Sequence, residues 1–279
     1  TTWRRYSGTT YDVDFIDNGS QLDYCQYKVE DSSDNILINW TVIAQDINSS
    51  TYTFDWEVQF SSLKCGYNYV SVRAYDKVGN LKEYDNVFYI KKDTEVPQVI
   101  DNQSGDDTWR NSAGTTYNVD FEDNLSKIDY IQYRIFASSE GASPLTDWLN
   151  LVNPGYNSTS YTENWQVSFA DCQNGVNYIG VRVFDVAGNS TTVQDVFYVK
   201  KDQEYPDIFD NQLGDDTWRR TDPGAIFNVD FKDLNYSHLK SAEYKITTGL
   251  GQTGDVIVDW TYIISSTNTP QYTQEWAVL

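Results

Sequence analysis

The stretch TTYDVDF at residues 9–15 returns as TTYNVDF at 115–121 and as AIFNVDF at 225–231. The first residues of these copies lie 106 and then 110 residues apart, and the nine Trp residues fall three to a copy. A period of about 108 residues is the length of a domain and not of a solenoid turn. The sequence therefore predicts three tandem domains, which we call unit 1 (1–93), unit 2 (94–202) and unit 3 (203–279).

The repeated stretch has the period of a β-strand. Tyr11, Val13 and Phe15 fall on one side of it, and Asp12 and Asp14 fall on the other, as in a half-buried strand. Later segments alternate in the same way, with inward positions expected at Cys25, Tyr27 and Val29, at Trp56, Val58 and Phe60, at Val70, Val72 and Ala74, and at their counterparts in units 2 and 3. About seven such strands per unit, without a helical period, predict an all-β chain of tandem Ig-like (fibronectin III-like) antiparallel β-sandwiches.

Two longer segments carry a family resemblance. GYNYVSVRAYDKVGN (66–80) and GVNYIGVRVFDVAGN (175–189) resemble the penultimate strand and hairpin of bacterial Ig-like repeats, which form tandem arrays on surface proteins and adhesins. Gly79 and Gly188 suit the positive φ of a tight turn, and the preceding aspartates suit its amides. The resemblance implies an extracellular, cell-surface or secreted protein.

Composition narrows the classes of function. With 20 Lys and Arg against 41 Asp and Glu, the net charge is −21, which repels nucleic acids and anionic membranes. No apolar run approaches the length of a membrane helix, about 18 residues. One His and three scattered Cys exclude zinc-finger spacing and most His-based catalysis. We expect cations and neighbouring repeats of the same or an identical chain as partners, with surface glycans or proteins as further candidates, and no nucleic acid and no membrane insertion by this segment.

Carboxylates gather at one end of each expected sandwich. Residues after the first shared strand, at the Asp-x-x-Gly-Asn hairpin and in the incoming linker should meet there. Oxygen-rich clusters of this kind suit Ca²⁺, much as in cadherin-type junctions, although the cadherin motifs are absent. The predicted ligands between units 1 and 2 are Asp93, Glu95, Asp123 and Asp185, with Asp120 as an outer acceptor, and those between units 2 and 3 are Asp202, Glu204 and Asp233. The alternative is a set of solvated acidic loops.

Two other functions compete for these residues. Paired carboxylates could serve a glycosidase, but groups that recur in every unit are more typical of architecture than of one active site. Trp and Tyr could stack on sugars, although Trp56 and Trp165 are in phase with inward Val and Phe and should pack in cores. We therefore predict a non-enzymatic structural or adhesive array, a surface stalk or filament component, with glycan-binding accessory modules of a secreted hydrolase as the alternative.

The outer units differ from unit 2. Unit 1 lacks the proline-led strand that precedes Trp109 and Trp218, and unit 3 stops before the last two strands that unit 2 contains. Incomplete sandwiches leave cores and strand edges open. We expect the chain to belong to a longer array or to receive strands from a neighbour.

Overall fold

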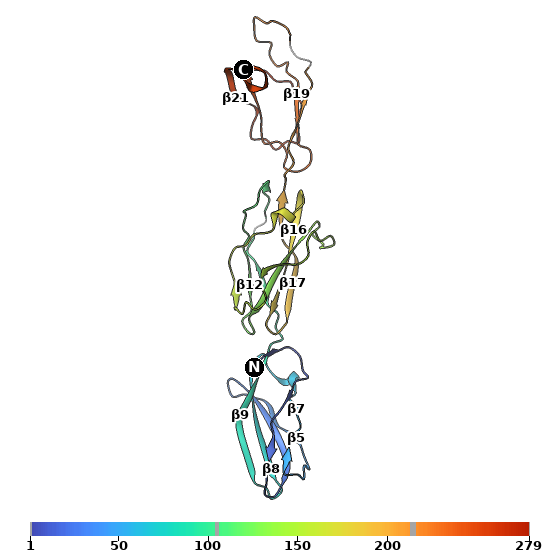
Figure 1. Ribbon diagram of the computed structural model, residues 1–279, viewed down its shortest axis with the longest axis vertical. Coiled ribbons are helices and arrows are strands. Elements are labelled where there is room, and N and C mark those ends of the chain that lie inside the picture. The colour runs from blue at the N-terminus through green and yellow to red at the C-terminus, as the bar shows by residue number, and fades with distance from the viewer. Residues whose placement is uncertain (1, 104–105, 213–215, 279) are drawn as a thin grey trace.

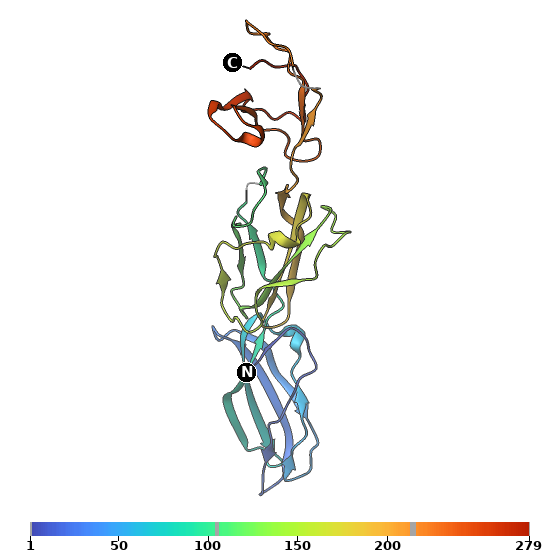
Figure 2. The same cartoon turned by 45° about the horizontal axis from the view of Figure 1, so that its top comes forward.

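The chain is an elongated series of β units. The computed structural model describes residues 2–103, 106–212 and 216–278, and the three units follow one another along a single long axis in two different views (Figures 1 and 2). Regular structure in these ranges consists of strands and short 3-10 turns. None of the helical turns in the described ranges is long and apolar enough to cross a membrane.

Unit 1 is a two-layer sandwich with one large sheet. Its elements are β1 (Trp3–Arg4), β2 (Thr10–Tyr11), β3 (Phe15–Ile16), β4 (Leu22–Asp31), β5 (Ile36–Ala44), β6 (Thr51–Tyr52), β7 (Trp56–Glu57), the 3-10 turn η1 (Phe60–Ser62), β8 (Gly66–Asp76) and β9 (Leu81–Lys92). The large sheet has the order β1-β9-β8-β4-β5, and the pairs β2-β7 and β3-β6 form the second layer.

Unit 2 repeats the large sheet and has a second layer that forms one three-stranded sheet. Its elements are β10 (Gln98–Asp101), β11 (Trp109–Arg110), β12 (Val119–Glu122), β13 (Ile128–Phe136), β14 (Leu149–Val152), β15 (Ser160–Tyr161), η2 (Phe169–Asp171), β16 (Gly175–Asp185) and β17 (Ser190–Lys201). The sheets have the orders β11-β17-β16-β13-β14 and β10-β12-β15. Among the described residues of unit 1, no strand corresponds to β10.

Unit 3 contains parts of both layers. Its elements are β18 (Asp207–Asp210), β19 (Val229–Lys232), β20 (Ala242–Thr247), η3 (Leu250–Gln252), β21 (Val256–Ile264) and β22 (Gln271–Tyr272). One sheet has the order β18-β19-β22, and the other is the hairpin β20-β21. The chain is therefore an all-β array of Ig-like sandwiches, as predicted.

The alternation of apolar residues places the cores. Cys25 and Val29 are fully buried in unit 1, and Phe121 and Ile131 are fully buried in unit 2. These residues belong to two separate clusters, one inside each sandwich. The predicted inward positions of these strands are confirmed, because every second residue of a strand lies on the same face.

One pairing departs from the purely antiparallel prediction. Strand β1 runs parallel to β9 in unit 1, and β11 runs parallel to β17 in unit 2. In unit 2 the chain first pairs antiparallel with the small sheet through β10 and then crosses to the edge of the large sheet as β11. The crossing strand keeps its direction, so it meets the last strand of the large sheet in parallel.

The strand predicted to continue through Phe60 is interrupted. Strand β7 ends at Glu57, and the 3-10 turn η1 follows. The Lys92 ammonium donates hydrogen bonds to the carbonyls of Phe60 (3.2 Å) and Leu63 (2.8 Å), and the Phe60 carbonyl also accepts the Leu63 amide (3.2 Å). Unit 2 repeats the arrangement with Lys201, which donates to Phe169 O and Cys172 O. A lysine from the last strand thus closes this turn in units 1 and 2.

The cysteines are free thiols. Cys25 and Cys172 are buried, and Cys65 is partly exposed. Burial raises the pKa of the Cys25 and Cys172 thiols to about 11. Both therefore act as small apolar core residues.

Candidate metal centre at the first junction

Asp93 ties unit 1 to unit 2. It follows β9, and its amide donates to Arg4 O (2.9 Å) in unit 1. Its Oδ2 accepts the Ser126 amide (3.1 Å), and its carbonyl accepts Nδ2 of Asn189 (3.2 Å), both in unit 2. The residue has no exposed surface. A linker carboxylate is therefore built into the end of the next sandwich.

Asp123 reaches the same place from β12. Its Oδ1 accepts the amides of Leu125 (3.2 Å) and Lys127 (2.7 Å), which folds the chain into a tight turn. Lys127 has a positive φ of 78° and exposes its side chain. Because Asp123 has the same strand parity as buried Phe121, its carboxylate continues the inward face, and the residue is only 5% exposed.

Asp185 arrives at the end of β16. Its Oδ1 accepts the Asn189 amide (2.7 Å), and its Oδ2 accepts the Asn189 side-chain amide (2.8 Å). Gly188 closes this hairpin with a φ of 89°, a conformation that glycine adopts without a steric cost. The hairpin thus fixes a carboxylate that is only 2% exposed.

The three carboxylates form one cluster. An oxygen from each of Asp93, Asp123 and Asp185 lies within 4.8 Å of the others, and all three residues are buried. None of the ion pairs in the described ranges includes any of them. Three acidic groups therefore share a small volume from which water is largely excluded.

The cluster is costly to ionise. Burial raises the pKa of Asp123, and the charge of Asp93 raises it further, against the hydrogen bond from Lys127. Burial also raises the pKa of Asp185, with the charges of Asp93 and Asp123 adding to the effect, against hydrogen bonds from Asn189. These directions follow from desolvation and from like charges at short range. A bound cation would offset both the cost of desolvating the carboxylates and the repulsion between their charges.

Two predicted ligands lie outside the cluster. The Glu95 amide donates to Asp93 Oδ1 (3.0 Å), while its side chain is exposed. Asp120 lies on the outward parity of β12, where its Oδ2 accepts Nδ2 of Asn102 (2.9 Å) and its Oδ1 is buried without a partner. The structure does not bring either carboxylate together with Asp93, Asp123 and Asp185. Asp120 and Asp123 are three positions apart, so a strand places them on opposite faces. The sequence alone could therefore have separated Asp120 from the cluster.

The second junction repeats the linker bonds without the full cluster. The Asp202 amide donates to Arg110 O (2.9 Å), and Asp202 Oδ2 accepts the Ser237 amide (3.0 Å). Burial acts to raise the pKa of Asp202, but hydrogen bonds from Ser237 and Glu204 outweigh it and hold the pKa below its ordinary value. The counterpart of Asp185 is absent from the sequence of unit 3. Within the described ranges, no group of three acidic side chains that could hold a metal ion includes the predicted ligands Asp202 and Asp233.

Glu204 joins units 2 and 3 by hydrogen bonds. Its Oε1 accepts Nδ2 of Asn174 (3.3 Å), and its Oε2 accepts Nδ2 of Asn235 (3.1 Å). Asp233 is partly exposed and accepts a long hydrogen bond from Ser237 Oγ (3.5 Å). The predicted ligand Glu204 thus serves as a polar link across the junction.

Aromatic rings add a contact that the sequence did not reveal. The Trp109 ring of unit 2 lies 5.9 Å from the Tyr236 ring of unit 3, centroid to centroid. At the first junction Trp3, Tyr67 and Leu125 line a common groove. A Trp ring therefore lies near a ring of the next unit at the second junction, while at the first junction Trp3 shares a groove with Leu125.

Other Trp residues bear on sugar stacking. Trp56 and Trp165 are buried at 6% and 4% exposure, as predicted. Trp40 and Trp148 are half-buried, and the guanidinium groups of Arg73 and Arg182 lie 4.1 and 4.4 Å from their ring centroids. Arginine therefore covers a ring face on each of these two side chains.

Comparison with solved structures finds similar β architectures at low sequence identity. A tetra-tandem repeat from the extending region of a large adhesion protein is 15% identical, with 97% of this chain and 67% of that chain covered and a TM-score of 0.36. A structure on host cell surface retention of a 1.5-MDa bacterial ice-binding adhesin is 14% identical, covering 97% and 80% with a TM-score of 0.33. The fibronectin(III)-like modules of Clostridium thermocellum CbhA are 13% identical, covering 72% and 90% with a TM-score of 0.28.

No family model matches the chain, and no curated protein matches it. At these identities and TM-scores the structural similarity assigns no function. The function has to be argued from the residues of this chain.

Proposed function

We propose that this chain is a non-enzymatic structural or adhesive array of an extracellular surface, a stalk or filament component whose first junction is held by Ca²⁺. Its partners are neighbouring repeats of the same kind. The observation that carries the proposal is the meeting of Asp93, Asp123 and Asp185, one from the linker and two from the next unit, in a buried cluster.

The repeated junction supports a role in extension. At both junctions a linker aspartate receives the amide of a serine in the next unit and donates its own amide to an arginine carbonyl in the previous one. Such bonds set the same register between successive units, and the units extend along one axis (Figure 1). An array built this way can extend over a long distance from the surface that carries it.

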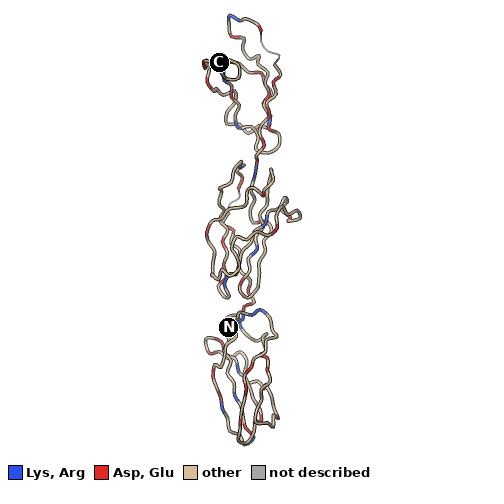
Figure 3. The backbone as a smooth tube through the Cα atoms, viewed as in Figure 1, with Lys and Arg blue, Asp and Glu red and all other residues tan. Residues whose placement is uncertain are grey.

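Calcium fits the chemistry of the first junction. Buried carboxylates a few ångströms apart repel by about 1 kcal/mol per pair or more, depending on the effective dielectric. Ca²⁺ takes six to eight oxygens, which carboxylates, carbonyls and water can supply together. A divalent ion would turn this repulsion into a cross-link between Asp93 of the linker and two loops of unit 2. Acidic residues along the rest of the chain (Figure 3) would supply long-range attraction for cations.

The competing functions have less support. The carboxylates recur as parts of turns and junctions, which favours a structural role over a glycosidase pair. The arginines over Trp40 and Trp148 and the burial of Trp56 and Trp165 disfavour a row of open sugar-stacking rings. We therefore retain the array as the proposed function.

Calorimetric titration of the chelator-treated full chain with CaCl₂ tests the metal part of the proposal. We expect one saturable site, weakened at least tenfold by Asp123→Asn. The matched control is Asp76→Asn, which changes the unit 1 hairpin aspartate, a residue outside the three-carboxylate cluster. Absence of calcium heat at millimolar concentration, or equal weakening by both substitutions, would contradict it.

A further inference from the structure

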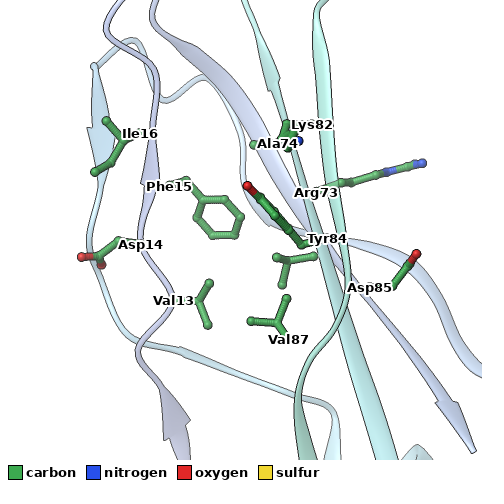
Figure 4. Close-up of a pocket in the computed structure, with 11 residues that line it drawn as sticks. Val13, Asp14, Phe15, Ile16, Arg73, Ala74, Lys82, Tyr84, Asp85 and Val87 are labelled. Atoms are coloured by element: carbon green, nitrogen blue, oxygen red, sulfur yellow. The ribbon is translucent and has the colours of Figure 1, made fainter.

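Unit 1 has a groove between its two layers that is filled in unit 2. The groove has a volume of about 320 Å³, and its apolar lining includes Val13, Phe15, Tyr84 and Val87. In Figure 4, Val13 and Phe15 come from one layer and face Tyr84 and Val87 from the other. The opening lies along β3, on the side of the sandwich away from β6.

Unit 2 shows what fills the equivalent space. Strand β10 pairs with β12 over four residues, from Gln98 opposite Glu122 to Asp101 opposite Val119. Val99 of β10 packs against the core of unit 2. The position of β10 in unit 2 therefore corresponds to the groove in unit 1.

Exposure changes at matching positions. Tyr84 and Val87 of unit 1 are 61% and 43% exposed. Their counterparts in unit 2, Val193 and Val196, are half-buried and pack against the core. The apolar surface that β10 covers in unit 2 is thus left open to water in unit 1.

The edge of β3 also offers unpaired backbone groups. The Asp17 amide donates to Ser50 O (2.9 Å), on the β6 side of the strand. Since neighbouring residues of a strand direct their peptide groups to opposite sides, Asp14 and Ile16 face the groove. The described residues place no strand on that side, because β3 pairs with β6 alone. In unit 2 the matching edge receives β10.

We propose that this groove of unit 1 binds an extended strand of the β10 type, supplied by a linker segment from outside unit 1. The strand adds antiparallel to β3 and places a β-branched apolar residue, equivalent to Val99, between Phe15 and Val87. Main-chain hydrogen bonds give affinity in this mode of recognition, and side-chain pockets give specificity. The inference is independent of the metal centre, because none of Asp93, Asp123 and Asp185 lines the groove.

The charged residues that line the groove are of both signs, two acidic (Asp14 and Asp85) and two basic (Arg73 and Lys82). Lys82 lines the groove at the position where unit 2 has Thr191, whose hydroxyl donates to Pro97 O just before β10. An ammonium at this position can donate to the same carbonyl of an incoming strand. The segment TEVPQVIDNQ (94–103) contains this Pro97 carbonyl together with the residues of β10.

Fluorescence anisotropy of a labelled TEVPQVIDNQ peptide, titrated with the full chain, tests the proposal. We expect saturable binding, a loss of at least tenfold when the peptide carries Val99→Asp, and a change of less than twofold when it carries Gln98→Ser. These substitutions lie in the peptide, so they cannot unfold the protein. Absence of saturable binding, or equal binding of the Val99→Asp peptide, would overturn the proposal.

Two chain variants identify the site and the occupant. Copying residues 94–106 ahead of Thr1 should fill the groove covalently and abolish peptide binding, and Ile16→Pro should weaken binding by removing an edge amide. Peptide binding that survives the covalent copy would place it elsewhere and overturn the proposal. Sedimentation gives the remaining outcome: a wild-type chain that self-associates through the groove and becomes monomeric with Ile16→Pro would assign the groove to a second copy instead.

Discussion

At the residue scale, Asp123 shows how a side chain can be positioned for a ligand at a cost to the fold. Its carboxylate is buried beside those of Asp93 and Asp185, and its pKa is raised mainly by that burial. In chelator, Asp123→Asn should stabilise unit 2 by about 1 kcal/mol, because the amide oxygen can still accept from Leu125 and Lys127 while the repulsion disappears. Hydrogen exchange of β16 peptides measures this effect. Faster exchange in the variant would contradict it.

The same raised pKa values predict a pH dependence. Between the ordinary carboxyl pKa of 3.8 and the raised pKa values of Asp123 and Asp185, these two groups bind more protons in the folded state than in the unfolded state. Stability therefore falls as pH rises through this window. In chelator, β16 should exchange more slowly near pH 4.5 than near pH 7, after correction for the intrinsic rate, and saturating Ca²⁺ should remove the difference at neutral pH. A metal-free chain that is most stable at pH 7 would contradict this expectation.

At the element scale, a lysine from the last strand stabilises each of the turns η1 and η2. Lys201 is 7% exposed and donates to Phe169 O (3.0 Å) and Cys172 O (2.8 Å). Lys201→Met should cost about 2 to 3 kcal/mol, since it leaves two carbonyls without their charged donor. The control Lys200→Met removes an ion pair to the exposed Asp107 and should cost less than about 1 kcal/mol. Denaturant unfolding compares them, and equal costs would contradict this role.

The strand pattern made much of the fold predictable. The alternation of apolar and polar residues predicts that residues such as Val29 and Phe121 are buried, because one face of each strand packs inward. The parallel strand β11 was not predictable in this way, because a two-residue strand has no period and its partner lies far along the chain. The turn η2 depends on Lys201, which is equally remote in sequence.

The candidate site was predictable in part. Position after a strand end located Asp123 and Asp185, and the linker supplied Asp93. Glu95 was included because of its charge, but its amide bonds to Asp93 Oδ1 and its side chain is exposed. Metal binding by the cluster depends on the free-energy cost of desolvating the carboxylates and on the free energy gained when they coordinate an ion. The spacing of residues in the sequence determines neither quantity.

At the scale of the whole molecule, successive units are connected by contacts at two junctions. The hydrogen bonds of the linker aspartate recur at both junctions, whereas the three-carboxylate cluster occurs, within the described ranges, at the first alone. Calcium should therefore narrow the range of orientations between units 1 and 2 and leave the second junction unchanged. The central claim is that this ion makes the first junction stiff.

Distance distributions between spin labels across the first junction test that claim most directly. Labels would replace exposed Ser32 in unit 1 and exposed Ser139 in unit 2, in a chain carrying Cys65→Ser. We predict a narrow distribution in Ca²⁺, a broad one in chelator, and a broad one under both conditions with Asp123→Asn. Distributions of equal width with Ca²⁺ and with chelator in the wild-type chain would contradict the account.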